Sequence, residues 1–294
     1  SSRRRHTRYI SVTGVQTCAL PISQIAQALG DTIALTSGAP SGSITLPAMR
    51  ILFIGGGSFT LPRWVEAVAP GSRLHVIEVD PEVTAVGTRW LGVALASPPS
   101  DRFPEGAGIG VVHGDARRVI RSLPAGAYDV VIGDAFADMA VPWHLTTGEF
   151  AREVRRVLRP GGRYAVNVID GWPGGQFLPA FLRTLQEAFT EVDALSTALP
   201  GFPKYDVVQN WVATAGDAPL DVASIEAMTR PGLTTEGAPA AVLPRVRLVT
   251  RDGVEAMPGT DPEAPPWGAM SRATSPLTDD LAPVDWYLGR RLAE

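Results

Sequence analysis

Residues suited to contact a nucleoside follow the first two apolar segments of the chain. Gly55, Gly56 and Gly57 come directly after the apolar run at 50–54, and Glu78 ends the next apolar segment. Glycines at such a turn let the backbone approach a ligand closely, since they carry no Cβ. A carboxylate at the end of the following strand can accept hydrogen bonds from both ribose hydroxyls. The pattern predicts a site for a ribose-containing ligand.

Two further acids follow the next two apolar segments, in Gly114-Asp115-Ala116 and in Gly133-Asp134. The carboxyl ends of parallel strands meet at one edge of a sheet, where open α/β sheets bind their ligands. Each acid alone is also explained as a helix N-cap, and for Asp115 the two interpretations are equally good. The complete set favours a ligand site, in which an acid after the third strand suits an adenine amino group.

The glycine turn departs from the pattern of pyrophosphate-binding turns. Thr60 stands where a third glycine would be expected in a dinucleotide site. A neutral glycine turn suits a sulfonium cofactor that carries no phosphates. The four histidines are scattered and Cys18 is the sole cysteine, so the sequence predicts no metal site.

Strands and helices alternate along most of the chain, which predicts βαβ units and a parallel sheet. Thr146 and Glu149 form the capping box that is expected to start one of the helices. The expected strands are 50–54, 74–79, 110–113, 129–132, 163–169, 192–199, 206–215 and 246–250. The expected helices are 61–69, 81–95, 116–123, 147–158 and 176–189. The fold class is α/β, a Rossmann-like, doubly wound, mostly parallel seven-stranded sheet with an antiparallel edge hairpin.

Four regions are expected along the chain. Residues 1–22 resemble a translated sequencing adapter and are interpreted as an artefact or a disordered segment. Residues 23–49 read as the remnant of a helix and a linker. An adenosyl-cofactor-binding α/β domain is expected at 50–216, and a C-terminal extension that packs on it at 217–294.

Composition limits the classes of partner and the compartment. The chain has 294 residues and a formal net charge of −4, which argues against a general nucleic-acid-binding surface. No apolar run is long enough to span a bilayer, so no membrane contact is expected in this fragment. We therefore expect a cytoplasmic protein that acts on a small molecule.

The arrangement resembles the class I S-adenosylmethionine-binding fold, and within it the spermidine synthase family, the polyamine aminopropyltransferases. The resemblance covers about 50–215 and a short stretch near the C-terminus. The matching stretches are Ile51-Leu-Phe-Ile-Gly-Gly-Gly57, Val76-Ile-Glu-Val-Asp-Pro81, Gly114-Asp-Ala116, Tyr128-Asp-Val-Val-Ile-Gly-Asp134, His144-Leu-Thr-Thr-Gly-Glu-Phe150 and Leu277-Thr-Asp-Asp-Leu-Ala-Pro283. By this resemblance the co-substrate is S-adenosylmethionine or its decarboxylated form, with no metal, and the reaction is aminopropyl transfer to an amine in polyamine biosynthesis.

The resemblance also implies roles for individual residues. Gly55 and Gly57 would flank the methionine-derived part of the cofactor, with Gly56 between them. Glu78 would bind the ribose, and Asp115 with Ala116 the adenine. Asp134 would be the acid that receives or orients the attacking amine, and it would also contact the cofactor. A homodimer is a further possibility.

The chain departs from the family in its acids. Ser58 follows the glycine turn where the family has an acidic residue, and the second acid after the fourth strand is displaced to Asp138. Phe136 is a candidate lid over the sulfonium carbon. Two alternatives stay open: methyl transfer from S-adenosylmethionine to a small molecule, and a non-catalytic adenosyl-binding domain.

Four charged or titratable residues near these motifs are assigned ordinary roles. His144 is expected to be a structural hydrogen-bonding residue in a loop beside the site. Asp170 is expected to be an exposed loop acid. Arg117 and Arg156 are expected to lie on solvated faces of their helices.

Overall fold

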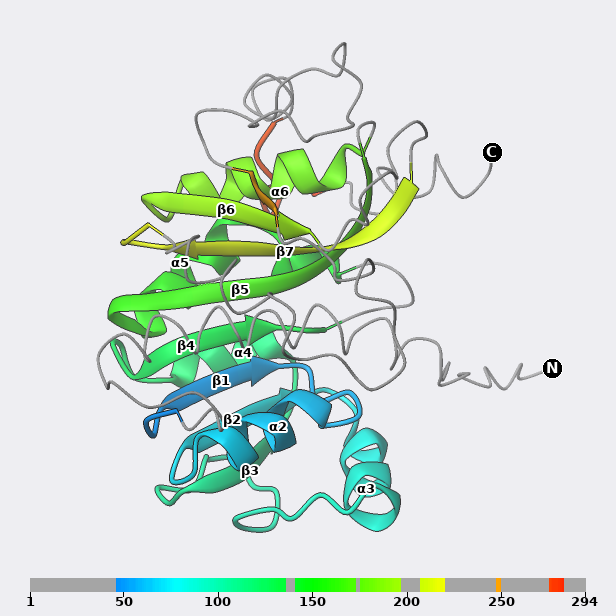
Figure 1. Cartoon of the computed structure of the whole chain (residues 1–294), viewed down its shortest axis with the longest axis vertical. Coiled ribbons are helices and arrows are strands. Elements are labelled where there is room, and N and C mark those ends of the chain that lie inside the picture. Colours follow the sequence, from blue (N-terminus) through cyan, green and yellow to red (C-terminus); the bar gives the residue numbers. More distant parts are fainter. Residues whose placement is uncertain are drawn as a thin grey trace, which may run out of the picture.

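The computed structural model describes residues 46–135, 141–172, 175–196, 207–219, 247–249 and 275–282. Within them the strands form an eight-stranded sheet in the order β3-β2-β1-β4-β5-β7-β6-β8 (Figure 1). The strands are β1 (Arg50–Ile54), β2 (Arg73–Glu78), β3 (Gly108–His113), β4 (Tyr128–Gly133), β5 (Leu158–Trp172), β6 (Glu191–Ser196), β7 (Val207–Gly216) and β8 (Arg247–Val249).

The first five strands run parallel, and β6, β7 and β8 pair antiparallel. The expected doubly wound, mostly parallel fold is therefore confirmed. The predicted hairpin is formed by β6 and β7, and the three-residue β8 pairs with β6 on the outer side of that hairpin. The chain passes from β3 across β1 to β4, so strand order reverses between β1 and β4, where sheets of this class bind ligands.

Helices cover both faces of the sheet because the parallel strands are apolar on both sides. In β1, Leu52 and Ile54 belong to one buried cluster, while Ile51 and Phe53 belong to the other. This alternation follows from the two-residue period of a strand. The first cluster includes residues of α4 (Ala116–Ser122), α5 (Gly148–Val157) and α6 (Phe177–Gln186), and the second includes residues of α2 (Thr60–Val68) and contacts α3 (Pro81–Trp90).

Several element boundaries differ from the sequence expectation, among them those of α3, α5 and β5. Helix α3 ends at Trp90 because Gly92, at a φ of 68°, turns the chain and returns the Val93 N–H to the Gly87 carbonyl. The N-cap of α5 is Thr147, whose hydroxyl accepts from the Phe150 N–H, and Thr146 bonds back to the Trp143 carbonyl instead. Strand β5 begins at Leu158, directly after α5, and so includes Gly161 and Gly162, which lie before the expected strand at 163–169.

A stretch near the C-terminus returns to the domain at residues 275–282. Leu277 is 1% exposed and lies among residues of α5 and α6. Its N–H donates to the Thr184 hydroxyl at 2.7 Å, and its carbonyl accepts from the Gly148 N–H at 2.9 Å. This stretch thereby joins the two helices. The remaining expectations for 1–45 and most of 217–294 fall outside the described residues, and the division of the chain into four regions stays a prediction.

No helix among the described residues has the length and apolar character needed to cross a bilayer.

Candidate functional site

The glycine turn after β1 lies directly against the end of β4. Gly55 has a φ of 97°, and a Cβ there would come within 2.6 Å of the Asp134 carbonyl oxygen. Only glycine fits this close approach. Gly57 also has a positive φ, of 48°, but a Cβ on it would meet no heavy atom within 4 Å. The turn is therefore packed on the Asp134 side and open at Gly57.

Glu78 closes the turn from the end of β2. Its Oε2 accepts from the Gly56 N–H at 2.7 Å, and its Oε1 accepts from the Asp80 N–H at 2.8 Å. The residue is 6% exposed, so these bonds offset much of the cost of burying the carboxylate. Each carboxylate oxygen has a second lone pair, so Glu78 keeps the capacity to accept from ribose hydroxyls.

Asp134 follows β4 and is partly buried beside Asn167 of β5. The Asn167 Nδ2 donates to Asp134 Oδ1 at 3.1 Å, and the Asp134 N–H donates to the Ile54 carbonyl at 2.9 Å. Burial raises the pKa of the Asp134 carboxyl from its ordinary 3.8 to about 6, while the bond from Asn167 opposes the rise. Such a group is ionised at neutral pH yet is a stronger base than a solvated carboxylate, which suits a proton acceptor.

Asp115 caps α4, as one of its two expected interpretations has it. Its Oδ1 accepts from the Arg118 N–H at 3.1 Å, while its Oδ2 lies 3.0 Å from His144 Nε2. Ala116, the first residue of α4, is 8% exposed. The Gly114 N–H donates to the Glu78 carbonyl at 2.9 Å, so the ends of β2 and β3 are also tied together.

Hydrogen bonds and close backbone approaches thus connect the ends of four neighbouring strands, at Gly55, Gly56, Glu78, Gly114 and Asp134. The ligand contacts assigned to these residues stay predictions. Phe136 and Asp138, the two candidate substrate residues, lie outside the described residues. Among the described residues, no group of three histidine, cysteine or acidic side chains is placed to hold a metal ion.

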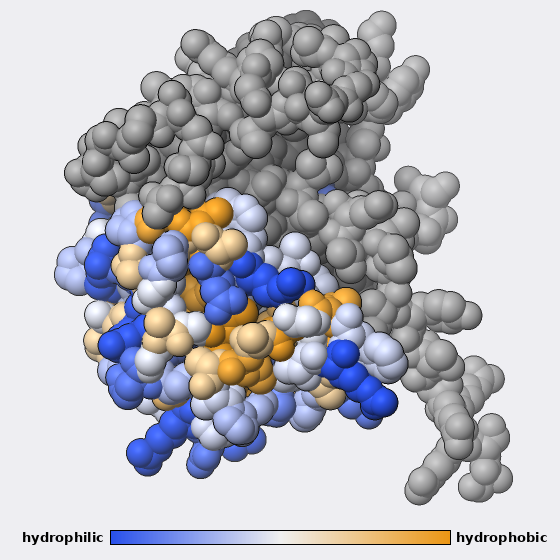
Figure 2. Space-filling view, turned by 60° about the horizontal axis from the view of Figure 1, so that its bottom comes forward, coloured by the Kyte–Doolittle hydropathy of each residue, from blue (hydrophilic) through white to orange (hydrophobic). Residues whose placement is uncertain are grey.

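The sequence motifs did not indicate two residues of the site, Val79 and Asn167. Val79, directly after Glu78, is 69% exposed although it is apolar, so its side chain is available to cover the face of a base. Figure 2 shows the end of the molecule that carries α3, where apolar surface lies among hydrophilic residues. An apolar residue just beyond a strand-ending acid is the signal that would have found it. Asn167 carries no local signal, because it lies inside β5 and reaches Asp134 only across the sheet.

Three of the ordinary roles were wrong. Asp170 is 1% exposed, and its carboxylate accepts from the Gly171 and Leu178 N–H groups near the start of α6. Arg117 has a 13% exposed side chain and binds the His144 carbonyl, the Thr147 hydroxyl and the Asp279 carboxylate. Arg156 donates to the Ile120 and Leu123 carbonyls at the end of α4. Arg117 and Arg156 contact partners that are distant in sequence, which helical spacing alone does not reveal. Asp170 is held by its neighbour Gly171 and by the helix that follows it.

No family model matches the chain. It is 31% identical over 123 residues to a polyamine aminopropyltransferase from Vibrio vulnificus, covering 41% of this chain and 38% of that protein. It is 33% identical over 130 residues to polyamine aminopropyltransferase 2 from Streptomyces coelicolor, covering 43% of this chain and 23% of that one. Over the matched residues the chain is similar to polyamine aminopropyltransferases. The matched part covers well under half the length of each of these two relatives.

Solved structures show the same fold. A probable spermidine synthase from Corynebacterium glutamicum aligns with a TM-score of 0.58 and 24% identity, over 78% of this chain and 73% of that one. Human methyltransferase-like protein 13, solved in complex with SAH, aligns with a TM-score of 0.54 and 18% identity, over 76% and 95% of the two chains. The predicted class I methyltransferase fold is thereby confirmed.

Proposed function

We propose that this aminopropyltransferase relative binds an adenosyl sulfonium cofactor at the joined strand ends and transfers its aminopropyl group to an amine. The observation that carries the proposal is the joining of the glycine turn to both acids, Glu78 by a hydrogen bond and Asp134 by backbone contact. Residues with the properties needed for ribose, adenine and amine thereby occupy one edge of the sheet.

The residues present fit such a cofactor. Glu78 has lone pairs left for two ribose hydroxyls, and Asp115 lies one strand further along, where it can accept from an adenine amino group. Val79 offers an apolar surface beside both. Gly57 leaves space for the sulfonium end of the ligand, and the turn carries no cation that would repel a sulfonium.

Asp134 would act on the amine. The nitrogen lone pair attacks the carbon next to the sulfonium, the new C–N bond forms, and the C–S bond breaks with its electrons returning to sulfur as methylthioadenosine leaves. The product nitrogen then carries one proton in excess, which Asp134 can accept because burial raises its pKa. Before the attack, the same carboxylate orients the amine by hydrogen bonding.

Product analysis tests the proposal. The chain, incubated with decarboxylated S-adenosylmethionine and a diamine such as putrescine, is expected to release methylthioadenosine, and Asp134→Asn is expected to release far less. Release that is equal in the variant would remove Asp134 from the reaction. Absence of release with every di- and polyamine tried would overturn aminopropyl transfer.

Methyl transfer is the second candidate, and Ser58 favours it. Its hydroxyl lies 2.7 Å from the Thr60 hydroxyl, so a neutral pair stands where the family has an acid. A less acidic site would bind a polycationic amine less well. Tighter binding of S-adenosylmethionine than of its decarboxylated form, with methylation of an acceptor, would favour this candidate. Binding of both forms without any turnover would leave the non-catalytic adenosyl-binding domain.

A further inference from the structure

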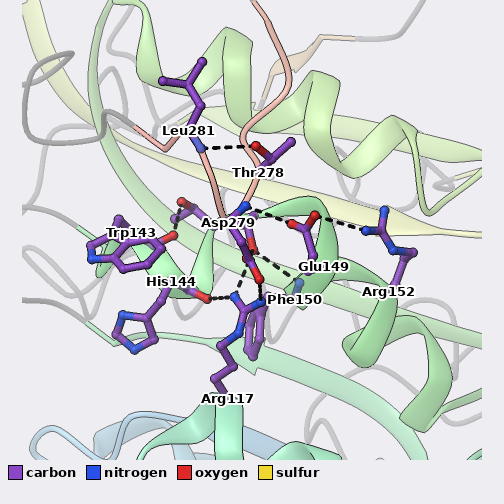
Figure 3. Close-up of polar contacts among 11 residues, drawn as sticks. Arg117, Trp143, His144, Glu149, Phe150, Arg152, Thr278, Asp279 and Leu281 are labelled. Atoms are coloured by element: carbon purple, nitrogen blue, oxygen red, sulfur yellow. Dashed lines mark hydrogen bonds and ion pairs between the residues drawn. The ribbon is translucent and has the colours of Figure 1, made fainter.

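A network of polar contacts connects the returning stretch at 275–282 with the expected adenine acid. Its members lie on three stretches of chain that are distant in sequence, 115–118, 143–149 and 275–282, and Figure 3 shows its central part around Arg117 and Asp279. The network joins Asp115 and His144, to which the sequence alone assigned unrelated roles. The inference drawn from it rests on the proposed function, since it concerns how the cofactor's base is recognised.

The side chain of His144 fixes one oxygen of Asp115. Because Oδ1 is held by the Arg118 N–H of α4, the contact of Oδ2 with His144 Nε2 at 3.0 Å sets the rotation of the carboxylate. The side chain of Asp115 is 37% exposed and that of His144 is 30% exposed, so surrounding core atoms hold neither of them in place. Without His144, the carboxylate would keep only the bond to the helix and could turn about it.

The backbone of His144 is held by the same helix. His144 lies in the short 3₁₀ turn η1 (Trp143–Leu145), and its carbonyl accepts from Arg117 Nη1 at 2.6 Å. Arg117 lies two residues after Asp115 in α4. One residue is therefore tied to the start of α4 twice, by its ring to Asp115 and by its carbonyl to Arg117.

The returning stretch supplies the charge that Arg117 needs. The Arg117 side chain is 13% exposed, and its guanidinium pairs with the Asp279 carboxylate. That carboxylate also accepts from the Thr147 hydroxyl at 2.8 Å. The Asp279 N–H in turn donates to Glu149 Oε2 at 3.1 Å (Figure 3). Removing the carboxylate would leave a largely buried cation without its counter-ion, which is costly. Arg117 would then be free to leave the His144 carbonyl for solvent.

We propose that His144 is a positioning residue that aims Asp115 at the exocyclic amino group of the adenine, and that Asp279 keeps it in place through Arg117. The base selectivity of the site therefore depends on a stretch of chain more than a hundred residues away. The role differs from general support of the fold, because it concerns one oxygen atom and one group of the ligand.

The test compares two probes by calorimetry, methylthioadenosine and methylthioinosine, which carries an oxygen in place of the amino group. The wild-type chain is expected to prefer the adenosine probe by about tenfold or more, as for a hydrogen bond to a charged acceptor. His144→Ala is expected to lose most of that preference through weaker binding of the adenosine probe, with the inosine probe bound within about twofold of wild type. His144→Gln, which can still donate to Asp115, is expected to restore part of it.

A second pair of variants tests the returning stretch. Asp279→Asn is expected to reduce the preference in the same direction, whereas the neighbouring exposed Asp280→Asn is the matched control and is expected to leave it unchanged. A merely structural role would weaken both probes equally in His144→Ala, and that result would overturn the inference, as would a wild-type chain that binds both probes alike. Failure of the wild-type chain to bind either probe would instead overturn the proposed function.

Discussion

At the scale of single residues, the candidate site is built from groups that serve the fold and the ligand at once. Glu78 accepts two backbone N–H groups and Asp115 caps a helix, yet each keeps lone pairs for a ligand. Asp134 is different, because burial disfavours its charged form. The acid expected to act on the substrate is thus the one whose ionised form destabilises the protein.

Substitutions at Glu78 should separate its two roles. Glu78→Gln keeps one acceptor oxygen and the shape of the side chain, so it is expected to weaken methylthioadenosine binding by about tenfold or more. Glu78→Ala leaves the Gly56 and Asp80 N–H groups without their acceptor and is expected to cost about 1–3 kcal/mol of stability besides. Calorimetry measures the affinity and urea denaturation the stability, with Glu82→Ala on the exposed surface of α3 as the control. Wild-type affinity in a folded Glu78→Gln would show that the ribose lies elsewhere.

Asp134 should give the stability and the activity opposite pH dependences. Its carboxyl has a pKa of about 6 in the folded chain against an ordinary value of 3.8, so the folded state binds the proton more tightly and loses stability as pH rises through this window. Asp134→Asn is therefore expected to be more stable than wild type at pH 7.5, by up to about 3 kcal/mol, with a smaller difference at pH 4.5. Turnover by the wild type should fall as pH drops below about 6. Urea denaturation at both pH values checks the first expectation, and a variant less stable at pH 7.5 would contradict it.

At the scale of elements, helices α4 and α5 are joined at both ends by arginines. Arg117 near the start of α4 contacts η1 and Thr147, the N-cap of α5. Arg156 in the last turn of α5 donates to the carbonyls of Ile120 and of Leu123, the C-cap of α4. The two helices are therefore fixed to each other at both ends, and the network around Asp115 lies at the end where Arg117 joins them.

Arg156 should be worth more than an ordinary surface arginine. Arg156→Ala removes the side-chain donor of the Leu123 carbonyl and leaves the Ile120 carbonyl with the Leu123 N–H alone, and it is expected to cost about 1–3 kcal/mol. Arg152→Ala is the matched control, because Arg152 also lies on α5 and also pairs with a glutamate three residues before it. It is expected to cost less than about 1 kcal/mol, as usual for exposed ion pairs. Equal losses in urea denaturation would show that the end of α4 gains nothing from Arg156.

At the scale of the whole molecule, the sheet has its candidate site at one edge and a distant stretch of chain pinned beside it. Residues 275–282 reach α4, α5 and α6 through Leu277 and Asp279. Their contribution is apolar at Leu277 and ionic at Asp279. The apolar part can be tested without touching the proposed site.

Leu277 should anchor this stretch. Leu277→Ala opens a cavity between α5 and α6 and is expected to cost about 2–5 kcal/mol, as for other buried leucines. Leu281→Ala, on the same stretch but 58% exposed, is expected to change stability by less than about 0.5 kcal/mol. Thermal and urea denaturation would both report the difference. Equal stability of the two variants would mean that the stretch contributes nothing to the folded domain.

The parallel arrangement of the sheet and the residues that follow its strands could be predicted from the sequence alone. Apolar runs such as 50–54, which is followed directly by glycines, favour strands buried on both faces, and their alternation with helical segments predicts a parallel sheet. Since parallel strands present their carboxyl ends at one edge, the chain order also placed Gly55, Glu78, Asp115 and Asp134 at that edge.

Only the tertiary structure decided which side chains meet there. Asn167 reaches Asp134 across neighbouring strands, His144 reaches Asp115 from a separate turn, and Asp279 reaches Arg117 over 162 residues. No periodicity encodes such contacts, because each depends on the packing of elements that are far apart in the chain. For the same reason Arg156, which local spacing assigned to the surface, is held by backbone carbonyls at the end of another helix.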